Sequence, residues 1–182
     1  MIKLKKHILL LGFMGSGKTT VAIHLANALR LHQVDLDTKI EAQTGITVRK
    51  IFEEQGEARF RKIESQMLKE ILEGQPTVVA LGGGTPIQEE NSKLIFNQDC
   101  ITIYLKYNSK ILTNRLFKHR TKRPLLIGYN TIEKLQAFIN LKMEGRSSHY
   151  EKANFIIQDE TNINQTSKLI INYLKFNDLI DQ

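Results

Sequence analysis

A glycine-rich stretch near the amino end has residue types and spacing suited to binding phosphate. Residues 12–19, Gly-Phe-Met-Gly-Ser-Gly-Lys-Thr, fit the pattern G-x-x-x-x-G-K-[ST] between an apolar run and a stretch with helical spacing. Glycines let backbone N–H groups approach phosphates, and a helix starting near Lys18 would direct its free N–H groups at the same anion. Lys18 would contact the β- and γ-phosphates, and the Thr19 hydroxyl would hold Mg²⁺. We therefore predict a nucleoside triphosphate site that includes Gly12, Gly15, Ser16, Gly17, Lys18, Thr19 and Thr20.

Two aspartates follow the second apolar run of the chain. Asp35 and Asp37 are two residues apart, and in an extended segment such residues point to the same face. Both carboxylates could then reach one crevice at the carboxyl end of a sheet. We expect Asp35 to serve the Mg²⁺ site and Asp37 to accept the proton of an acceptor hydroxyl. The alternative is one helix N-cap and one surface acid, with the helix starting near Thr38.

An arginine and a run of glycines extend the candidate site. Arg61 has Glu57 four residues before it and Glu64 three residues after it, which is typical of a surface ion-pair network. The alternative is that its planar guanidinium binds a substrate carboxylate. The third apolar run ends in three consecutive glycines, which would let the backbone approach a ligand closely: Gly82, Gly83 and Gly84.

A basic segment at 118–130, KHRTKRPLLIGYN, interrupts the regular pattern. A solvated loop is the ordinary interpretation of such a charge run. The alternative is a lid that excludes water and brings Arg123 onto the charge of the transferred phosphate. Arg146, placed late in a predicted long helix, is a weak signal by itself, because arginines on a helix face are usually solvated.

The elements that must position these residues alternate in kind. Short apolar runs predict strands covered on both faces at 7–12, 33–35, 77–81, 101–105 and 154–158. Helical spacing predicts helices at 19–31, 48–55, 57–72, 109–118, 132–150 and 165–176. Gly56 and Gly74 are expected to end helices, and Asn130 with Glu133 to cap the long one. This alternation predicts an α/β fold, a parallel sheet with helices on both sides.

Length and composition limit the class of protein. The 182 residues are 41% hydrophobic without a long apolar stretch, which predicts a single domain and no membrane span. The lone Cys100 allows no internal disulfide, and the basic, apolar amino end lacks a signal cleavage site, so we expect a cytoplasmic protein. The net charge of +7 suits either nucleic acid or an anion pocket. No basic stripe interleaved with aromatics and no zinc-ligand spacing occurs, which disfavours nucleic acid.

Six stretches together make the chain resemble the shikimate kinase family over essentially its whole length. In order they are GFMGSGKTT, DLDTKIEAQTG, IFEEQGEARFRKIE, LGGGTP, RPLL and GRSSHYEKA. The resemblance implies a five-stranded parallel sheet of the P-loop type, similar to nucleoside monophosphate kinases. It also implies a helical substrate-binding region at about 35–64 and a lid at about 113–126. The implied reaction transfers the γ-phosphate of ATP to the 3-hydroxyl of shikimate, with Mg²⁺, on the route to chorismate and the aromatic amino acids.

The resemblance also implies roles for single residues. Thr19 and Asp35 would serve the metal, and Lys18, Asp37 and Arg123 would be catalytic. Asp37 would hydrogen-bond the shikimate hydroxyls as well. The residues that would bind the shikimate carboxylate are Arg61, Arg146 and the glycines 82–84. The family arginine beside adenine corresponds to Arg115. The partner would be the small molecule alone, without nucleic acid or membrane, and the protein would be a monomer.

Two stretches depart from the family pattern. After Arg146 the family reads x-P-L-Y, whereas this chain has Ser147-Ser148-His149-Tyr150. The loop at 158–165, QDETNINQ, lacks the basic residue that some relatives place near adenine. The residues also leave other classes open: a gluconate or nucleotide kinase, a nucleotide-binding module without catalysis, and a nucleic-acid binder.

Overall fold

A parallel β-sheet forms the centre of the molecule, which is described here from a computed structural model covering residues 4–97, 99–160 and 162–180. Within these residues the sheet has five strands in the order β2-β3-β1-β4-β5, and all pairs are parallel. The strands are β1 His7–Leu11, β2 Gln33–Asp35, β3 Val78–Ala80, β4 Cys100–Lys106 and β5 Phe155–Gln158. This confirms the predicted five-stranded parallel sheet. Because β1 lies between β3 and β4, the loop that follows it opens at the middle of the sheet's carboxyl edge.

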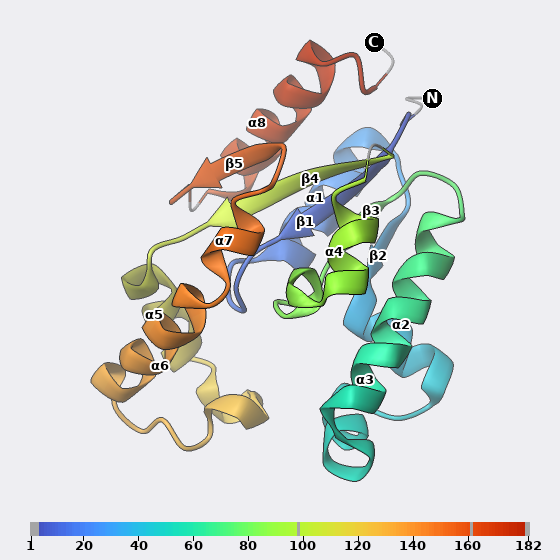
Figure 1. Cartoon of the computed structure of the whole chain (residues 1–182). Coiled ribbons are helices and arrows are strands. Elements are labelled where there is room, and N and C mark those ends of the chain that lie inside the picture. Colours follow the sequence, from blue (N-terminus) through green and yellow to red (C-terminus); the bar gives the residue numbers. More distant parts are fainter. Residues whose placement is uncertain (1–3, 98, 161, 181–182) are drawn as a thin grey trace.

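Helices connect the strands and cover both faces of the sheet (Figure 1). They are α1 Lys18–Leu29, α2 Leu36–Thr44, α3 Val48–Leu72, α4 Glu89–Ile95, α5 Ser109–Phe117, α6 Ile132–Glu144, α7 Ser147–Tyr150 and α8 Ile163–Phe176. Single 3₁₀ turns lie at Thr85–Ile87, Arg120–Lys122 and Pro124–Leu126. In the part of the chain that the structure describes, no helix has both the length and the apolar character needed to cross a membrane.

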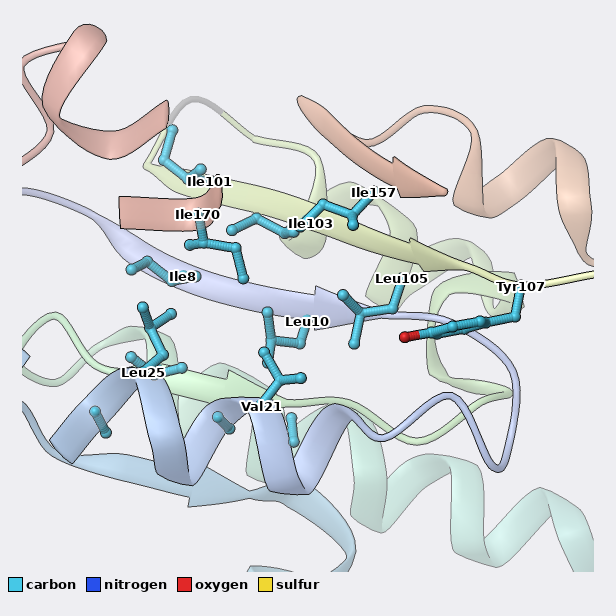
Figure 2. Packing of buried hydrophobic residues seen from close by; sticks show 14 of the residues in the cluster. Ile8, Leu10, Val21, Leu25, Ile101, Ile103, Leu105, Tyr107, Ile157 and Ile170 are labelled. Atoms are coloured by element: carbon cyan, nitrogen blue, oxygen red, sulfur yellow. The ribbon is translucent and has the colours of Figure 1, made fainter. Parts of the chain in front are cut away.

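Alternation along β1 explains why the strands read as continuously apolar. Ile8 and Leu10 belong to the core cluster that also contains side chains of α1 and α8. Leu9 and Leu11 belong to a second cluster with side chains of α3 and α4. Figure 2 shows the first cluster, where Leu10 lies next to Val21 and Ile8 next to Leu25, both of α1. Both faces of the strand are therefore buried, as in sheets with helices on each side.

Several predicted element boundaries were wrong or incomplete. The helix expected at 132–150 is broken: α6 ends at Glu144 and α7 starts at Ser147. The N-cap of α6 is Thr131, not Asn130, and its hydroxyl accepts a hydrogen bond from the backbone N–H of Lys134. The short α4, in which five of seven residues are polar, was not predicted. At Gly56, with φ 79° and ψ 170°, the backbone of α3 is kinked, which agrees with the predicted stop.

Two helical arms extend beyond the sheet. Helices α2 and α3 pack together on one side of the molecule, and α5 and α6 pack together on the other (Figure 1). The first arm carries Asp37 and Arg61, and the chain between α5 and α6 carries Arg123. The phosphate-loop motif lies at the carboxyl end of β1, so the candidate site takes its residues from the sheet and from both arms.

Candidate active site

The loop after β1 has a backbone that requires glycine. Gly12 has φ 144°, and a Cβ there would lie 2.9 Å from the carbonyl oxygen of Leu105 in β4. Gly15 has φ 80°, and its Cβ would lie 2.9 Å from Cγ of Leu116. The N-cap of α1 is Gly17, which offers no side-chain acceptor to the first turn. The N–H groups of that turn are therefore available for an anion.

Lys18 and Ser16 carry polar atoms that suit a bound phosphate. Nζ of Lys18 donates to the carbonyl oxygens of Gly12 at 2.8 Å and Phe13 at 3.1 Å, so the side chain lies across the loop. Burial lowers the pKa of Lys18 to about 8, although the nearby carboxylates of Asp37 and Asp35 oppose the shift. Oγ of Ser16 is buried without a hydrogen-bond partner among the described residues. Such a buried hydroxyl normally has a partner, and a phosphate oxygen would provide one.

Asp35 and Thr19 form the oxygen pair best placed for a cation. Oγ1 of Thr19 donates to Oδ2 of Asp35 at 2.6 Å. The other carboxylate oxygen, Oδ1, accepts from the backbone N–H of Thr38 at 3.2 Å, so Asp35 is also the N-cap of α2. Mg²⁺ binds oxygen and commonly takes one or two protein ligands, with water and phosphate completing its shell. The hydroxyl and carboxylate present here fit that requirement.

Asp37 lines a cavity beside the phosphate loop, but it does so from a helix and not from the extended segment that was predicted. Helix α2 begins at Leu36, so Asp37 lies in its first turn and the two aspartates do not share an extended face. A cavity of about 260 Å³ is lined by Asp35, Asp37 and residues of the phosphate loop, with Gly82, Gly83 and Arg123. Burial, reinforced by Asp35 and Glu64, raises the pKa of Asp37 to about 6, while Lys18 opposes the shift. The carboxylate is therefore mostly ionised at neutral pH and able to take a proton.

Arg61 lies behind this cavity and does not line it. Its Nη1 donates to Oε2 of Glu64 at 2.9 Å and its Nη2 to Oε1 of Glu57 at 3.0 Å, so the predicted ion-pair network exists. The network is not a surface one throughout, because the Arg61 side chain is 18% exposed and that of Glu64 only 1%. The guanidinium also lies against the glycine turn, since a Cβ on Gly84 would be 2.6 Å from Nη2.

Glu64 is a residue of the site that the sequence reasoning missed. Besides Arg61, it accepts hydrogen bonds from Oγ1 of Thr85 at 2.7 Å and Nδ2 of Asn91 at 3.2 Å. A usable signal was its spacing, because Glu64 lies four residues from Phe60 and from Leu68, both buried on the same helix face. An acid within such an apolar stripe needs buried partners.

Arg146 sits at the break between α6 and α7, not late in a helix as predicted. Its Nη1 donates to the carbonyl oxygen of Gly83 at 3.3 Å, and its guanidinium lies 5.5 Å from the centre of the Phe13 ring. Arg61 and Arg146 therefore meet the same glycine turn, at Gly84 and Gly83, although neither lines the 260 Å³ cavity.

A second, larger cavity of about 490 Å³ lies on the other side of the phosphate loop. Arg115 and Tyr107 line it, and the guanidinium stacks 4.2 Å from the centre of the tyrosine ring. Arg115 also donates to the carbonyl oxygen of Gly15 at 3.3 Å. Thr20 and Arg123 line both cavities, so Arg123 lies where the two meet. The sequence reasoning did not single out Tyr107 or His119, which also lines this cavity.

Comparison with known sequences finds relatives over most of the chain. A family model described as shikimate kinase matches residues 14–175. A shikimate kinase of Flavobacterium johnsoniae is 36% identical over 169 residues, covering 92% of this chain and 98% of the relative. One of Thermodesulfovibrio yellowstonii is 39% identical over 155 residues, covering 85% of this chain and 86% of the relative.

Comparison with solved structures extends the likeness to three dimensions. The shikimate kinase of Bacteroides thetaiotaomicron superposes with a TM-score of 0.86 at 31% identity, covering 96% of this chain and 99% of the other. The enzyme of Acinetobacter baumannii, solved in complex with shikimate, gives a TM-score of 0.81 at 32% identity, covering 96% and 95%. Sequence and structure agree over nearly the whole length, and the chain belongs to the shikimate kinase family.

Proposed function

We propose that shikimate is phosphorylated in the 260 Å³ cavity, between the phosphate loop and the glycine turn 82–84. As a shikimate kinase, the chain transfers the γ-phosphate of ATP to the 3-hydroxyl of shikimate and uses Mg²⁺. The observation that carries the proposal is that Lys18, Asp37 and Arg123 line this one cavity although they come from three separate parts of the chain. Such convergence of a cation, a carboxylate and an anion-binding loop is what phosphoryl transfer needs.

The phosphate loop is assigned to ATP. Its N–H groups and the side chains of Ser16, Thr19 and Thr20 surround the phosphates, and Lys18 exchanges the carbonyls of Gly12 and Phe13 for phosphate oxygens. Thr19 and Asp35 would hold Mg²⁺, which when bound would neutralise part of the charge on the phosphates. Arg115, stacked on Tyr107 in the 490 Å³ cavity, is assigned to the adenine side of the nucleotide.

Asp37 is assigned as the base that takes the proton of the attacking hydroxyl. It lies beside the glycine turn, since a Cβ on Gly82 would be 3.2 Å from its Oδ1. With a pKa of about 6, the group is ionised at neutral pH yet basic enough to accept a proton in the transition state. The same carboxylate hydrogen-bonds the acceptor hydroxyl, which holds it in line with the γ-phosphate.

The carboxylate of shikimate is assigned to the glycine turn and its two arginines. Arg61 and Arg146 lie against Gly84 and Gly83, and two guanidinium groups offer the planar donors that a carboxylate binds best. The Acinetobacter relative was solved with shikimate bound, which supports an acid site in this fold. Residues 35–64 would thus form the substrate-binding region.

Arg123 is assigned to the lid, which spans about residues 113–126. Its position at the junction of the two cavities would bring its charge onto the phosphate as it moves from ATP to shikimate. All the groups assigned here come from one chain, so we infer that the protein acts as a monomer. We place it in the cytoplasm, where the buried thiol of Cys100 stays reduced.

The experiment is an acceptor panel with the purified protein. ADP formation is measured with ATP and Mg²⁺ alone and after adding shikimate, gluconate or a nucleoside monophosphate. We expect ADP to form at an appreciable rate only with shikimate, in equal amount with shikimate 3-phosphate. Turnover on another acceptor alone would overturn the assignment of the acid site. Equal ADP formation without any acceptor would overturn the catalytic geometry proposed here.

A further inference from the structure

Tyr150 is a buried tyrosine behind the acid site to which no role has been assigned so far. It ends the single-turn helix α7, its side chain is fully buried, and its ring lies 5.1 Å from that of Tyr104 in β4. A buried phenol needs a hydrogen-bond partner. The hydroxyl of Tyr150 donates to the carbonyl oxygen of Gly83, 67 residues away in sequence.

The same carbonyl oxygen also receives the guanidinium of Arg146. Nη1 of Arg146 donates to it at 3.3 Å, and a carbonyl oxygen has lone pairs for both donors. Arg146 is the N-cap of α7 and Tyr150 is its last residue, so the single turn between them lets both side chains reach this oxygen. The Phe13 ring, 5.5 Å from the Arg146 guanidinium, supports it from the phosphate loop.

Local hydrogen bonds hold the backbone at Arg146: its N–H donates to the carbonyl oxygen of Met143 at 2.9 Å, and its carbonyl oxygen accepts from the N–H of Tyr150 at 3.2 Å. Gly145 precedes Arg146 and Ser147, Ser148 and His149 follow it, in place of the proline of the family pattern. Arg146 itself lies outside the helix, with φ −120° and ψ −26°. The backbone bonds do not set the direction of the Arg146 side chain, which depends on the side chains around it. Among these, the hydroxyl of Tyr150 ties α7 to the glycine turn.

We propose that Tyr150 is a positioning residue: by holding the Gly83 carbonyl, it keeps α7 and the glycine turn in register, so that Arg146 points at the shikimate carboxylate. This inference rests on the acid-binding role proposed above for Arg146. The turn is also packed against the phosphate loop, because a Cβ on Gly83 would lie 3.5 Å from the backbone nitrogen of Met14. Slippage of α7 would thus misplace the acid relative to the bound phosphates.

Tyr150→Phe tests this, because it removes one buried oxygen and leaves the ring packing with Tyr104 intact. We expect the KM for shikimate to rise about fivefold to tenfold, the range that one net hydrogen bond supports. The KM for ATP and the thermal midpoint should change little, since Arg146 still satisfies the Gly83 carbonyl. Tyr104→Phe is the matched control on the same sheet face, and its two KM values should be those of the native chain.

A double-mutant cycle separates positioning from packing. In the background of Arg146→Ala, the change Tyr150→Phe should raise the KM for shikimate no further, because the residue acts through Arg146. Equal effects in both backgrounds, an unchanged KM for shikimate, or loss of the fold in Tyr150→Phe would each overturn the inference. If Arg146→Ala alone leaves the KM for shikimate unchanged, the proposed role of Arg146 fails together with this inference. The acceptor panel tests shikimate phosphorylation itself, so its result depends on neither the role of Arg146 nor that of Tyr150.

Discussion

Replacing Glu64 by glutamine probes the buried network behind the acid site. The carboxylate is 1% exposed and accepts hydrogen bonds from Arg61, Thr85 and Asn91. Glutamine keeps the shape and one acceptor oxygen, so the main loss is the charge that faces Arg61. Arg61 retains Glu57 through Nε and Nη2, which limits the damage.

The size of the effect follows from this partial loss. A hydrogen bond to a charged group contributes about 1.5–3 kcal/mol. Breaking a fully buried ion pair costs about 3–5 kcal/mol, and the remaining contact with Glu57 places this case below that range. We therefore expect Glu64→Gln to lower the free energy of unfolding by about 2–3 kcal/mol. For a chain of this length that lowers Tm by roughly 4–12 °C.

The assay is unfolding by urea and by heat, together with steady-state kinetics. Glu53→Gln is the matched control, because Glu53 lies on the same helix α3 and pairs with Arg49 while both side chains are more than half exposed. Its loss should be below about 0.5 kcal/mol. Glu64→Gln should also raise the KM for shikimate, since Arg61 loses the partner that holds it against Gly84. If the two variants were equally stable, Glu64 would not be the buried anion described here.

The remaining predictions concern the base, the glycine turn and a buried histidine. Asp37→Asn should lower kcat by about 100- to 10,000-fold while the KM for ATP stays within a few-fold, because the phosphate loop is untouched; a mild loss of kcat would show that another group takes the proton. Gly84→Ala places a Cβ 2.6 Å from Nη2 of Arg61, so the KM for shikimate should rise and that for ATP should not, and an equal rise in both would argue against a local effect. Burial lowers the pKa of His7 below 6.5. As the pH falls, the unfolded chain therefore binds a proton at His7 before the folded chain does. The stability that neutral His7 contributes is present above about pH 6.5 and is lost as the pH falls through the folded pKa. His7→Asn, which keeps an acceptor for the N–H of Thr77, should therefore flatten the loss of unfolding free energy between about pH 7.5 and about pH 5.5 in urea titrations, and identical pH dependences would refute this.

Sequence reasoning placed Asp35 and Asp37 at one site, but for a partly wrong reason. The expectation assumed an extended segment, whereas Asp37 lies in the first turn of α2. Asp35 combines the two alternatives that seemed to exclude each other, since one oxygen caps α2 and the other accepts from Thr19. A carboxylate has two oxygens, so a structural role and a functional one are compatible in a single side chain.

The predicted long helix at 132–150 shows a second limit of local pattern. Helical spacing continues across Gly145 and Arg146, yet the backbone turns there because Arg146 and Tyr150 both reach Gly83, more than sixty residues away in sequence. Contacts between residues so far apart in sequence outweigh local helix propensity. A stretch of sequence as long as one helix never contains both partners of such a contact.

By itself, the sequence determined the phosphate loop, the five strands and their order along the chain, and the family. These depend on contiguous residues, whose glycine conformations, helix start and apolar periodicity are local properties of the backbone. Tertiary structure alone decided that Glu64 is buried, that the pKa of Asp37 is raised and that Arg61 and Arg146 meet one glycine turn. Burial and charge pairing depend on which distant side chains come into contact, and the physical reason is that desolvation and Coulomb energies follow distance in space and not in sequence.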